Sequence, residues 1–77
     1  MNQMQLKEFN DKKIVYLFIP ENNGNPGEVE YNFESGKARV TKDAGDPSPS
    51  YAHHAILAVE RCVEKNNLPI NYINAWY

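Results

Sequence analysis

Six consecutive apolar residues, Ile14-Val15-Tyr16-Leu17-Phe18-Ile19, form the stretch that decides the fold. Two lysines precede this run, and Pro20-Glu21 closes it. The run is too short for a membrane span and short for a core helix, and its β-branched and aromatic side chains favour a β-strand. Because the run is unbroken rather than alternating, we expect both faces of this strand to be covered.

Length and composition indicate one small globular domain over residues 1–77. The chain has 77 residues, of which 42% are hydrophobic, and its formal net charge is -2. A single core of this size supplies only about 3–5 kcal/mol, so small domains usually need a disulfide, a metal or a partner. Cys62 is the only cysteine, which excludes an intrachain disulfide and fits a reducing, cytoplasmic compartment. Self-association is therefore an expected source of stability.

The charge pattern and the short apolar run argue against two classes of partner. The eight lysines and arginines are scattered along the chain rather than gathered in a block, so we expect no nucleic-acid partner. The apolar run is shorter than the roughly 7–15 apolar residues of a secretion signal, and Pro20-Glu21-Asn22 follows it in place of a cleavage site. We therefore expect no membrane partner.

The clearest strand pattern lies at residues 28–34, where Val29, Tyr31 and Phe33 alternate with polar residues. If Ser35-Gly36 is a two-residue hairpin loop, the next strand covers residues 37–42, and apolar side chains face apolar ones. The predicted register pairs Glu34 with Lys37, Phe33 with Ala38, Asn32 with Arg39, and Tyr31 with Val40.

Two weaker strand patterns lie at the ends of the chain. Met4 and Leu6 alternate with polar residues, which predicts a short edge strand within residues 2–9, with fraying of the terminus as the alternative. Residues 70–77 are rich in β-forming side chains and predict a final strand, either parallel or antiparallel to its neighbour.

A helix is predicted from about residue 49 to residue 66. Ser48 is a natural N-cap with Pro49 at the first helical position, and Asn66 or Asn67 can take the left-handed conformation that ends a helix. At about 100° per residue, the helix has one apolar face. This face consists of Ala52, Ala55, Ile56, Val59, Cys62 and Val63, with Tyr51 and Ala58 at its flanks.

The predicted order is β-β-β-α-β, or the same order with one more strand at the N-terminus. It indicates an α+β fold, a two-layer sandwich in which the helix packs on one face of an antiparallel β-meander. One helix covers only one face, so the second face of the strand at residues 14–19 needs another cover. The candidates are the Met4/Leu6/Phe9 segment, the Trp76-Tyr77 tail, or another chain.

No constellation of residues matches a catalytic or metal-binding pattern. His53 and His54 are adjacent, so on a helix their side chains point about 100° apart and cannot share one ion, which requires i,i+4 spacing. Cys62 lies near the helix C-terminus, where a thiolate is disfavoured, so we expect it to be structural. The loop with Asp43 and Asp46 lacks the alternating oxygens of an EF-hand. We therefore expect no catalytic residue, no metal and no cofactor.

Four residues are expected at an interface: Tyr16, Phe18, Leu57 and Trp76. Tyr16 and Phe18 belong to the strand whose second face needs a cover, and Leu57 lies off the apolar helix face. We predict that Tyr16→Lys or Phe18→Lys, whichever lies outside the helix-covered face, gives a folded monomer.

These observations favour a small interaction or regulatory module that self-associates, most simply as a dimer. The alternatives are a small metal-dependent or hydrolytic enzyme that uses His53 and His54, and an adaptor that binds a different protein, as an antitoxin or a phage accessory protein does. The order of meander, helix and strand resembles HicB-type antitoxins, which have a partial ribonuclease-H-like fold. This resemblance rests on element order alone and assigns no residue a role.

Overall fold

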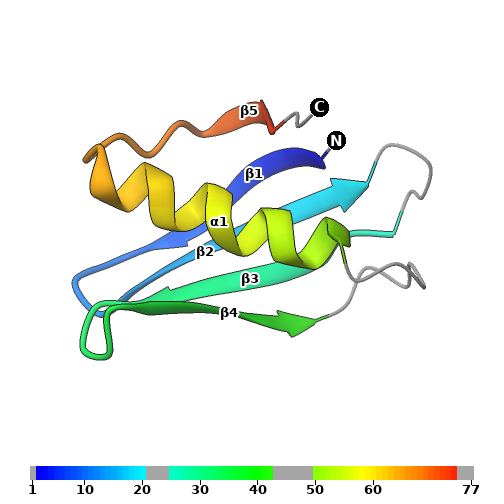
Figure 1. Cartoon of the computed structure of the whole chain (residues 1–77). Helices are drawn as coiled ribbons and strands as arrows, with labels where there is room; N and C mark the ends of the chain where they lie inside the picture. Colours follow the sequence, from blue (N-terminus) through cyan, green and yellow to red (C-terminus); the bar gives the residue numbers. More distant parts are fainter. Residues whose placement is uncertain (1, 21–24, 43–49, 75–77) are drawn as a thin grey trace.

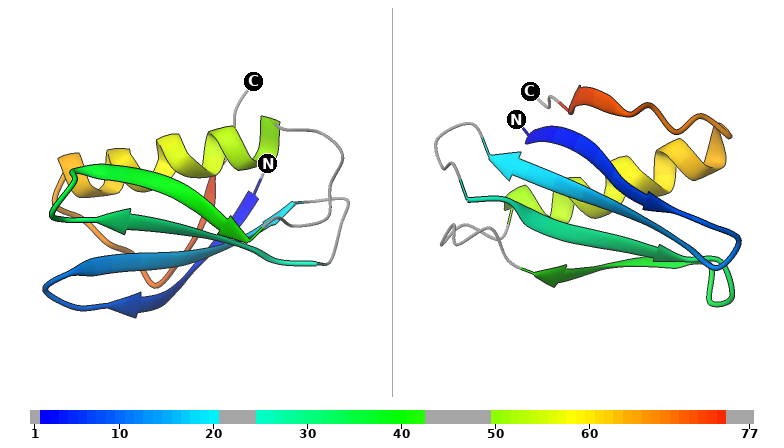
Figure 2. Two further views of the ribbon diagram at one scale, coloured as in Figure 1. Left: turned by 90° about the horizontal axis from the view of Figure 1, so that it is seen from below. Right: turned by 180° about the vertical axis from the view of Figure 1, so that it is seen from behind.

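The structure is a computed structural model that describes residues 2–20, 25–42 and 50–74. The strands form one sheet in the order β4-β3-β2-β1-β5, in which all neighbours are antiparallel, and the helix lies across one face (Figures 1 and 2). The predicted α+β meander with a helix on one face is confirmed, with the additional strand at the N-terminus. The elements are β1 (Asn2–Phe9), β2 (Lys13–Pro20), β3 (Gly27–Asn32), β4 (Lys37–Lys42), α1 (Ser50–Glu64) and β5 (Asn71–Asn74).

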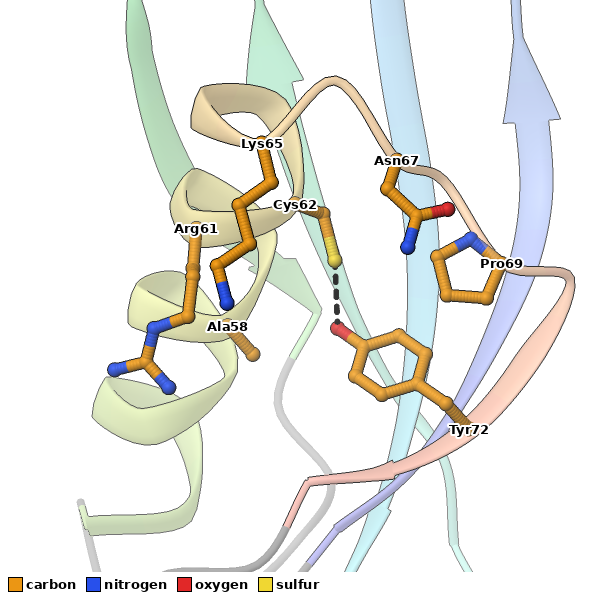
Figure 3. Close-up of a pocket in the computed structure, with 7 residues that line it drawn as sticks. All are labelled: Ala58, Arg61, Cys62, Lys65, Asn67, Pro69 and Tyr72. Carbon is orange, nitrogen blue, oxygen red and sulfur yellow. Dashed lines mark hydrogen bonds between the residues drawn. The ribbon is translucent and has the colours of Figure 1, made fainter.

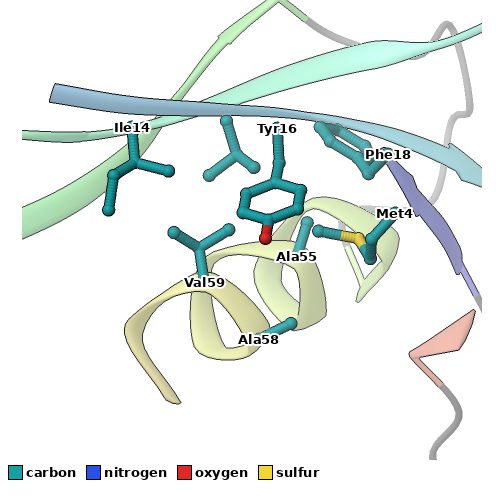
Figure 4. Close-up of a cluster of buried hydrophobic side chains, with 8 residues drawn as sticks. Met4, Ile14, Tyr16, Phe18, Ala55, Ala58 and Val59 are labelled. Carbon is teal, nitrogen blue, oxygen red and sulfur yellow. The ribbon is translucent and has the colours of Figure 1, made fainter. Parts of the chain in front are cut away.

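The apolar run forms β2, which is the central strand of the sheet. Alternation turns Ile14, Tyr16 and Phe18 toward α1, where each side chain is at most 1% exposed. The odd-numbered residues of the run therefore face the opposite side of the sheet. The core between the sheet and α1 (Figure 4) is completed by Met4, Val29, Ala55, Ala58 and Val59.

Strand β1 lies inside the sheet, so the prediction that it is an edge strand is wrong. It pairs with β2 on one side and with β5 on the other. The helix carries the chain back across the sheet, and the last strand joins the free side of β1 in the antiparallel direction. Within the predicted range 70–77, β5 covers residues 71–74, and residues 75–77, including Trp76, lie outside the described residues.

The register predicted for the β3–β4 hairpin is wrong by two residues. Tyr31 pairs with Ala38 instead of Val40. A shift of two residues keeps side chains on their predicted faces, because alternation has a period of two. Phe33, however, leaves the strand for the turn and is 41% exposed, so it is lost from the predicted core face.

The turn between β3 and β4 explains this shift. The turn contains the four residues 33–36 instead of the predicted two-residue loop, because the Asn32 side chain caps it. The Asn32 Oδ1 atom accepts hydrogen bonds from the backbone N–H groups of Glu34 and Ser35, at 2.8 and 3.1 Å. Gly36 closes the turn with a φ of 70°, and its N–H donates to the Asn32 carbonyl at 2.8 Å. An asparagine side chain that caps the turn thus replaces the tighter predicted loop.

Helix α1 ends in the predicted way. Asn66 has a left-handed φ of 54°, its N–H donates to the Val63 carbonyl, and the Asn67 N–H donates to the Cys62 carbonyl, both at 3.0 Å. These two bonds form a Schellman motif. The predicted N-cap, residues 48 and 49, lies outside the described residues. Nowhere in the described ranges is a helix long and apolar enough to cross a membrane.

The buried face of α1 is centred on Ala55 and Val59, which are fully buried. Ala58, predicted to flank this face, is also buried at 5% exposure. The small alanines let the helix approach the large side chains of β2. The remaining residues of the predicted apolar face are half-buried: Ala52, Ile56, Cys62 and Val63.

Two asparagines fix α1 to the ends of β1 and β5. Asn2 and Asn74 are paired across the two strands. The Asn2 Nδ2 group donates to the Tyr51 carbonyl at 2.9 Å, and the Asn74 Nδ2 group donates to the His54 carbonyl at 3.2 Å. Asn2 is fully buried, so a polar side chain helps to dock the start of the helix.

Candidate functional site

The side of the sheet away from α1, here called the open face, carries a central apolar column. The column consists of Val15, Leu17 and Ile19 on β2, and Ile73 on β5 lies in line with Ile19 through their common neighbour Gln3. Val15 is 7% exposed, whereas Ile73 is 58% exposed, and Leu17 and Ile19 are half-buried. The open face is therefore only partly covered by the described part of the chain.

Ion pairs that cross β2 lie over part of the column. Lys7 Nζ lies 2.7 Å from Glu28 Oε1 and so joins β1 to β3 across β2. Lys13 Nζ lies 3.6 Å from Glu8 Oε2 and 3.5 Å from Glu30 Oε1. Glu8 and Glu30 are the cross-strand neighbours of Val15, so these pairs lie beside it while their charged ends remain in water. A partial cover of the strand's second face thus comes from the lysines and glutamates.

The ion pairs among the described residues combine equal numbers of acidic and basic side chains. Three acidic and three basic side chains form the pairs, with Arg39 Nη2 at 3.6 Å from Glu30 Oε2 as the last of them. The hydrogen bond from Lys7 lowers the pKa of Glu28 below its ordinary value, because it stabilises the carboxylate. The column of apolar side chains is therefore framed by paired charges of both signs.

Two of the four predicted interface residues do not fit an interface. Tyr16 and Phe18 are buried under α1 at 0% and 1% exposure, since both are even-numbered residues of β2. Leu57 is 41% exposed on the outer side of α1, and Trp76 lies outside the described residues. Sequence reasoning missed Leu17, Ile19 and Ile73, although alternation along β2 separates the first two from Tyr16 and Phe18.

A second candidate site is a pocket between α1 and β5 (Figure 3). Its volume is about 200 Å³. The Cys62 thiol donates to the Tyr72 hydroxyl at 3.4 Å across the pocket, and Arg61 and Lys65 contribute the exposed positive charges of its lining. The lining is completed by Ala58, Asn67 and Pro69.

Two tyrosines connect this pocket to the core. The Tyr16 ring packs edge-on against Tyr72, with ring centres 5.8 Å apart, and the Tyr16 hydroxyl donates to the Pro69 carbonyl at 2.6 Å. Burial raises the pKa of Tyr16 to about 12, and the nearby Cys62 side chain makes a smaller contribution in the same direction. Burial also raises the pKa of Tyr72, and the contact with Cys62 adds to this shift. Both hydroxyls therefore remain protonated at neutral pH, Tyr16 as the donor to Pro69 and Tyr72 as the acceptor from Cys62.

These shifts predict a loss of stability at alkaline pH. A phenol whose pKa is higher in the folded state than its ordinary value near 10 favours the folded state below pH 10. That contribution declines as the pH rises from about 10 through the folded-state value of about 12. We expect the free energy of unfolding, measured by urea denaturation, to fall over this window. Tyr16→Phe should make the fall shallower, and an unchanged slope in this variant would contradict the assignment.

His53 and His54 do not belong to a metal site made by the described residues. The rings of His53 and His54 lie 5.8 Å apart at an interplanar angle of 66°. Within residues 2–20, 25–42 and 50–74, no group of three or more histidine, cysteine, aspartate or glutamate side chains is placed to hold a metal ion. Asp43 and Asp46 lie outside these ranges.

The fold and its surfaces define the class of this chain as a small α+β domain in which the described residues leave one sheet face partly uncovered. Comparisons with protein-family models, with curated proteins and with solved structures found no match. Its function is therefore argued from its own residues.

Proposed function

We propose that this chain is a small cytoplasmic protein-interaction module that self-associates through the open face of its sheet. The observation that carries the proposal is the apolar column, because Leu17 and Ile19 lie at the centre of a sheet and yet remain partly exposed. An intrachain disulfide cannot stabilise the small core, since Cys62 is the only cysteine, and small domains commonly gain stability by association.

The border of the column favours a second copy as the partner. Two copies related by a twofold axis bring the same patch together, so the patch must be compatible with itself. A border of ion pairs with charges of both signs meets this condition, whereas a border of one charge would repel its own copy. The cytoplasmic location is supported by the single cysteine, which fits a reducing compartment.

The test is the solution mass of two matched leucine variants. Leu17→Lys should convert a dimer into a folded monomer, because an unpaired lysine buried in the interface costs on the order of 3 kcal/mol, roughly a hundredfold in the dissociation constant. Leu57→Lys is the control, since Leu57 is exposed on the opposite side of the molecule. The measurement is light scattering after gel filtration across a tenfold dilution, with circular dichroism to verify folding.

Two other results would contradict the proposal. A dimer lost only in Leu57→Lys would place the interface on the helix and contradict the role of the open face. A wild-type monomer at every concentration would contradict self-association and favour an adaptor that binds a different protein.

A further inference from the structure

The two edges of the sheet differ in their protection against an added strand. Strand β4 carries Lys37, Arg39 and Lys42 within six residues, and charged side chains, especially lysines, are the usual means of blocking an edge. Strand β5, with the sequence NYIN, carries no charge. The β5 edge is therefore the one that can accept another strand.

The backbone of β5 presents hydrogen-bonding groups at this edge. Leu6 N donates to the Ile70 carbonyl at 2.8 Å, so residues 70, 72 and 74 direct their backbone groups toward β1, given the antiparallel register. By alternation, the N–H and C=O groups of Asn71 and Ile73 point away from the sheet. An extended segment beside β5 can pair with both residues.

The pocket beside β5 adds side-chain specificity to this edge. Tyr72 points to the helix side of β5 and lines the pocket together with Arg61 and Lys65 (Figure 3). Lys65 follows the last residue of α1 and its N–H donates to the Arg61 carbonyl at 3.0 Å, so the two cations lie one helical turn apart and repel each other. Neither forms an ion pair within the described residues. An anionic group at the pocket would satisfy both.

We propose that the β5 edge binds an extended segment of a different protein, which adds to the sheet as a further strand and directs an acidic side chain toward Arg61 and Lys65. Backbone pairing with Asn71 and Ile73 provides affinity, and the pocket selects the side chain opposite Tyr72, as in other complexes formed by strand addition. The residues on either side of the acidic one face the open side, where Ile73 is 58% exposed, and should be apolar.

A second copy of this chain does not match the site. Neither edge strand of a second copy supplies an acidic side chain, since β4 has the sequence KARVTK and β5 the sequence NYIN. The proposed partner is therefore a different protein, and the inference does not depend on self-association through the open face.

The experiment uses the full chain and the blocked peptide Ac-STVEVTS-NH2, whose glutamate lies between two valines. In a nitrogen-labelled NMR titration, we expect the amide signals of Asn71 and Ile73 to shift. The glutamine peptide Ac-STVQVTS-NH2 should bind about three- to tenfold more weakly, as expected for losing exposed ion pairs, and added salt should narrow this gap. The double variant Arg61→Gln/Lys65→Gln should abolish the gap, whereas the control Lys37→Gln should preserve it.

The contribution of the backbone is tested separately. Ile73→Pro removes an outward N–H that the β1–β5 pairing does not use, so it should abolish peptide binding, whereas Ile73→Thr keeps this group and should bind. If Ile73→Pro is unfolded, Asn71→Pro removes the other outward N–H and takes its place. Titration of Leu17→Lys should give the wild-type result, which separates this inference from the proposed dimer.

Three outcomes would overturn the inference. Equal affinities for the glutamate and glutamine peptides would show that the pocket does not select an acidic side chain. Signal shifts along β4 instead of β5 would place binding at the other edge. A wild-type dimer that becomes monomeric through Ile73→Pro would show that a second copy occupies β5.

Discussion

Tyr16→Ala is expected to unfold the domain at 25 °C. Tyr16 is fully buried, its ring packs edge-on against Tyr72, and its hydroxyl donates to the Pro69 carbonyl at 2.6 Å. Truncating a large buried aromatic side chain to alanine costs about 3–5 kcal/mol, which is comparable to the roughly 3–5 kcal/mol that a core of this size supplies. Circular dichroism and urea denaturation would show the loss of the folded state.

Tyr16→Phe is the matched control for this substitution. It keeps the ring and removes only the hydroxyl, so the domain should stay folded and lose about 1 kcal/mol with the hydrogen bond. The same burial predicts that Tyr16→Lys unfolds the chain, because neither Tyr16 nor Phe18 lies outside the helix-covered face, where a folded monomer was predicted. A folded Tyr16→Ala with nearly wild-type stability would contradict the central position of this residue.

Gly27→Val is expected to have the second largest effect. Gly27 pairs with Phe18 across β2 and β3, and a Cβ atom at this position would lie 2.6 Å from Cε1 of the Phe18 ring and 2.8 Å from the backbone oxygen of Lys42. The ring is buried and the oxygen belongs to the backbone, so neither can move away easily. Overpacking of this kind costs about 1–3 kcal/mol, and the midpoint of urea denaturation should fall accordingly.

Gly36→Asn is the control for Gly27→Val. Gly36 has a left-handed φ of 70°, and its Cβ position has only the Tyr31 hydroxyl within reach, at 4.0 Å. Asparagine adopts this conformation more readily than other residues, so stability should change by a few tenths of a kcal/mol at most. A larger loss in Gly36→Asn than in Gly27→Val would contradict the close packing of Phe18 on β3.

Local patterns were sufficient to predict most of the elements. The apolar run of β2, the alternation around Val29 and Tyr31, and the left-handed end of α1 at Asn66 depend on neighbours in the sequence, and the structure confirms each of them. The turn after β3 was mispredicted because Asn32 caps it with its side chain, and composition alone does not distinguish this turn from a two-residue loop.

The candidate sites were less predictable because they depend on which strands become neighbours. Alternation along β2 separates Tyr16 and Phe18 from Leu17 and Ile19, but the side that receives the helix is decided by the packing of α1. The pocket joins Arg61 on α1 to Tyr72 on β5, and the edge at Ile73 exists because β5 pairs with β1. These relationships lie beyond the reach of local sequence patterns.

The sequence by itself determined that this chain forms a meander with one helix, because the period of its apolar residues changes from two to 3.6 where the helix begins. Only the tertiary structure decided that β1 is an inner strand, that Lys7 and Glu28 pair across β2, and that an uncharged edge lies beside a basic pocket. The physical reason is that periodicity records which side of its own element a residue faces. The partners of that side are set by long-range pairing and packing.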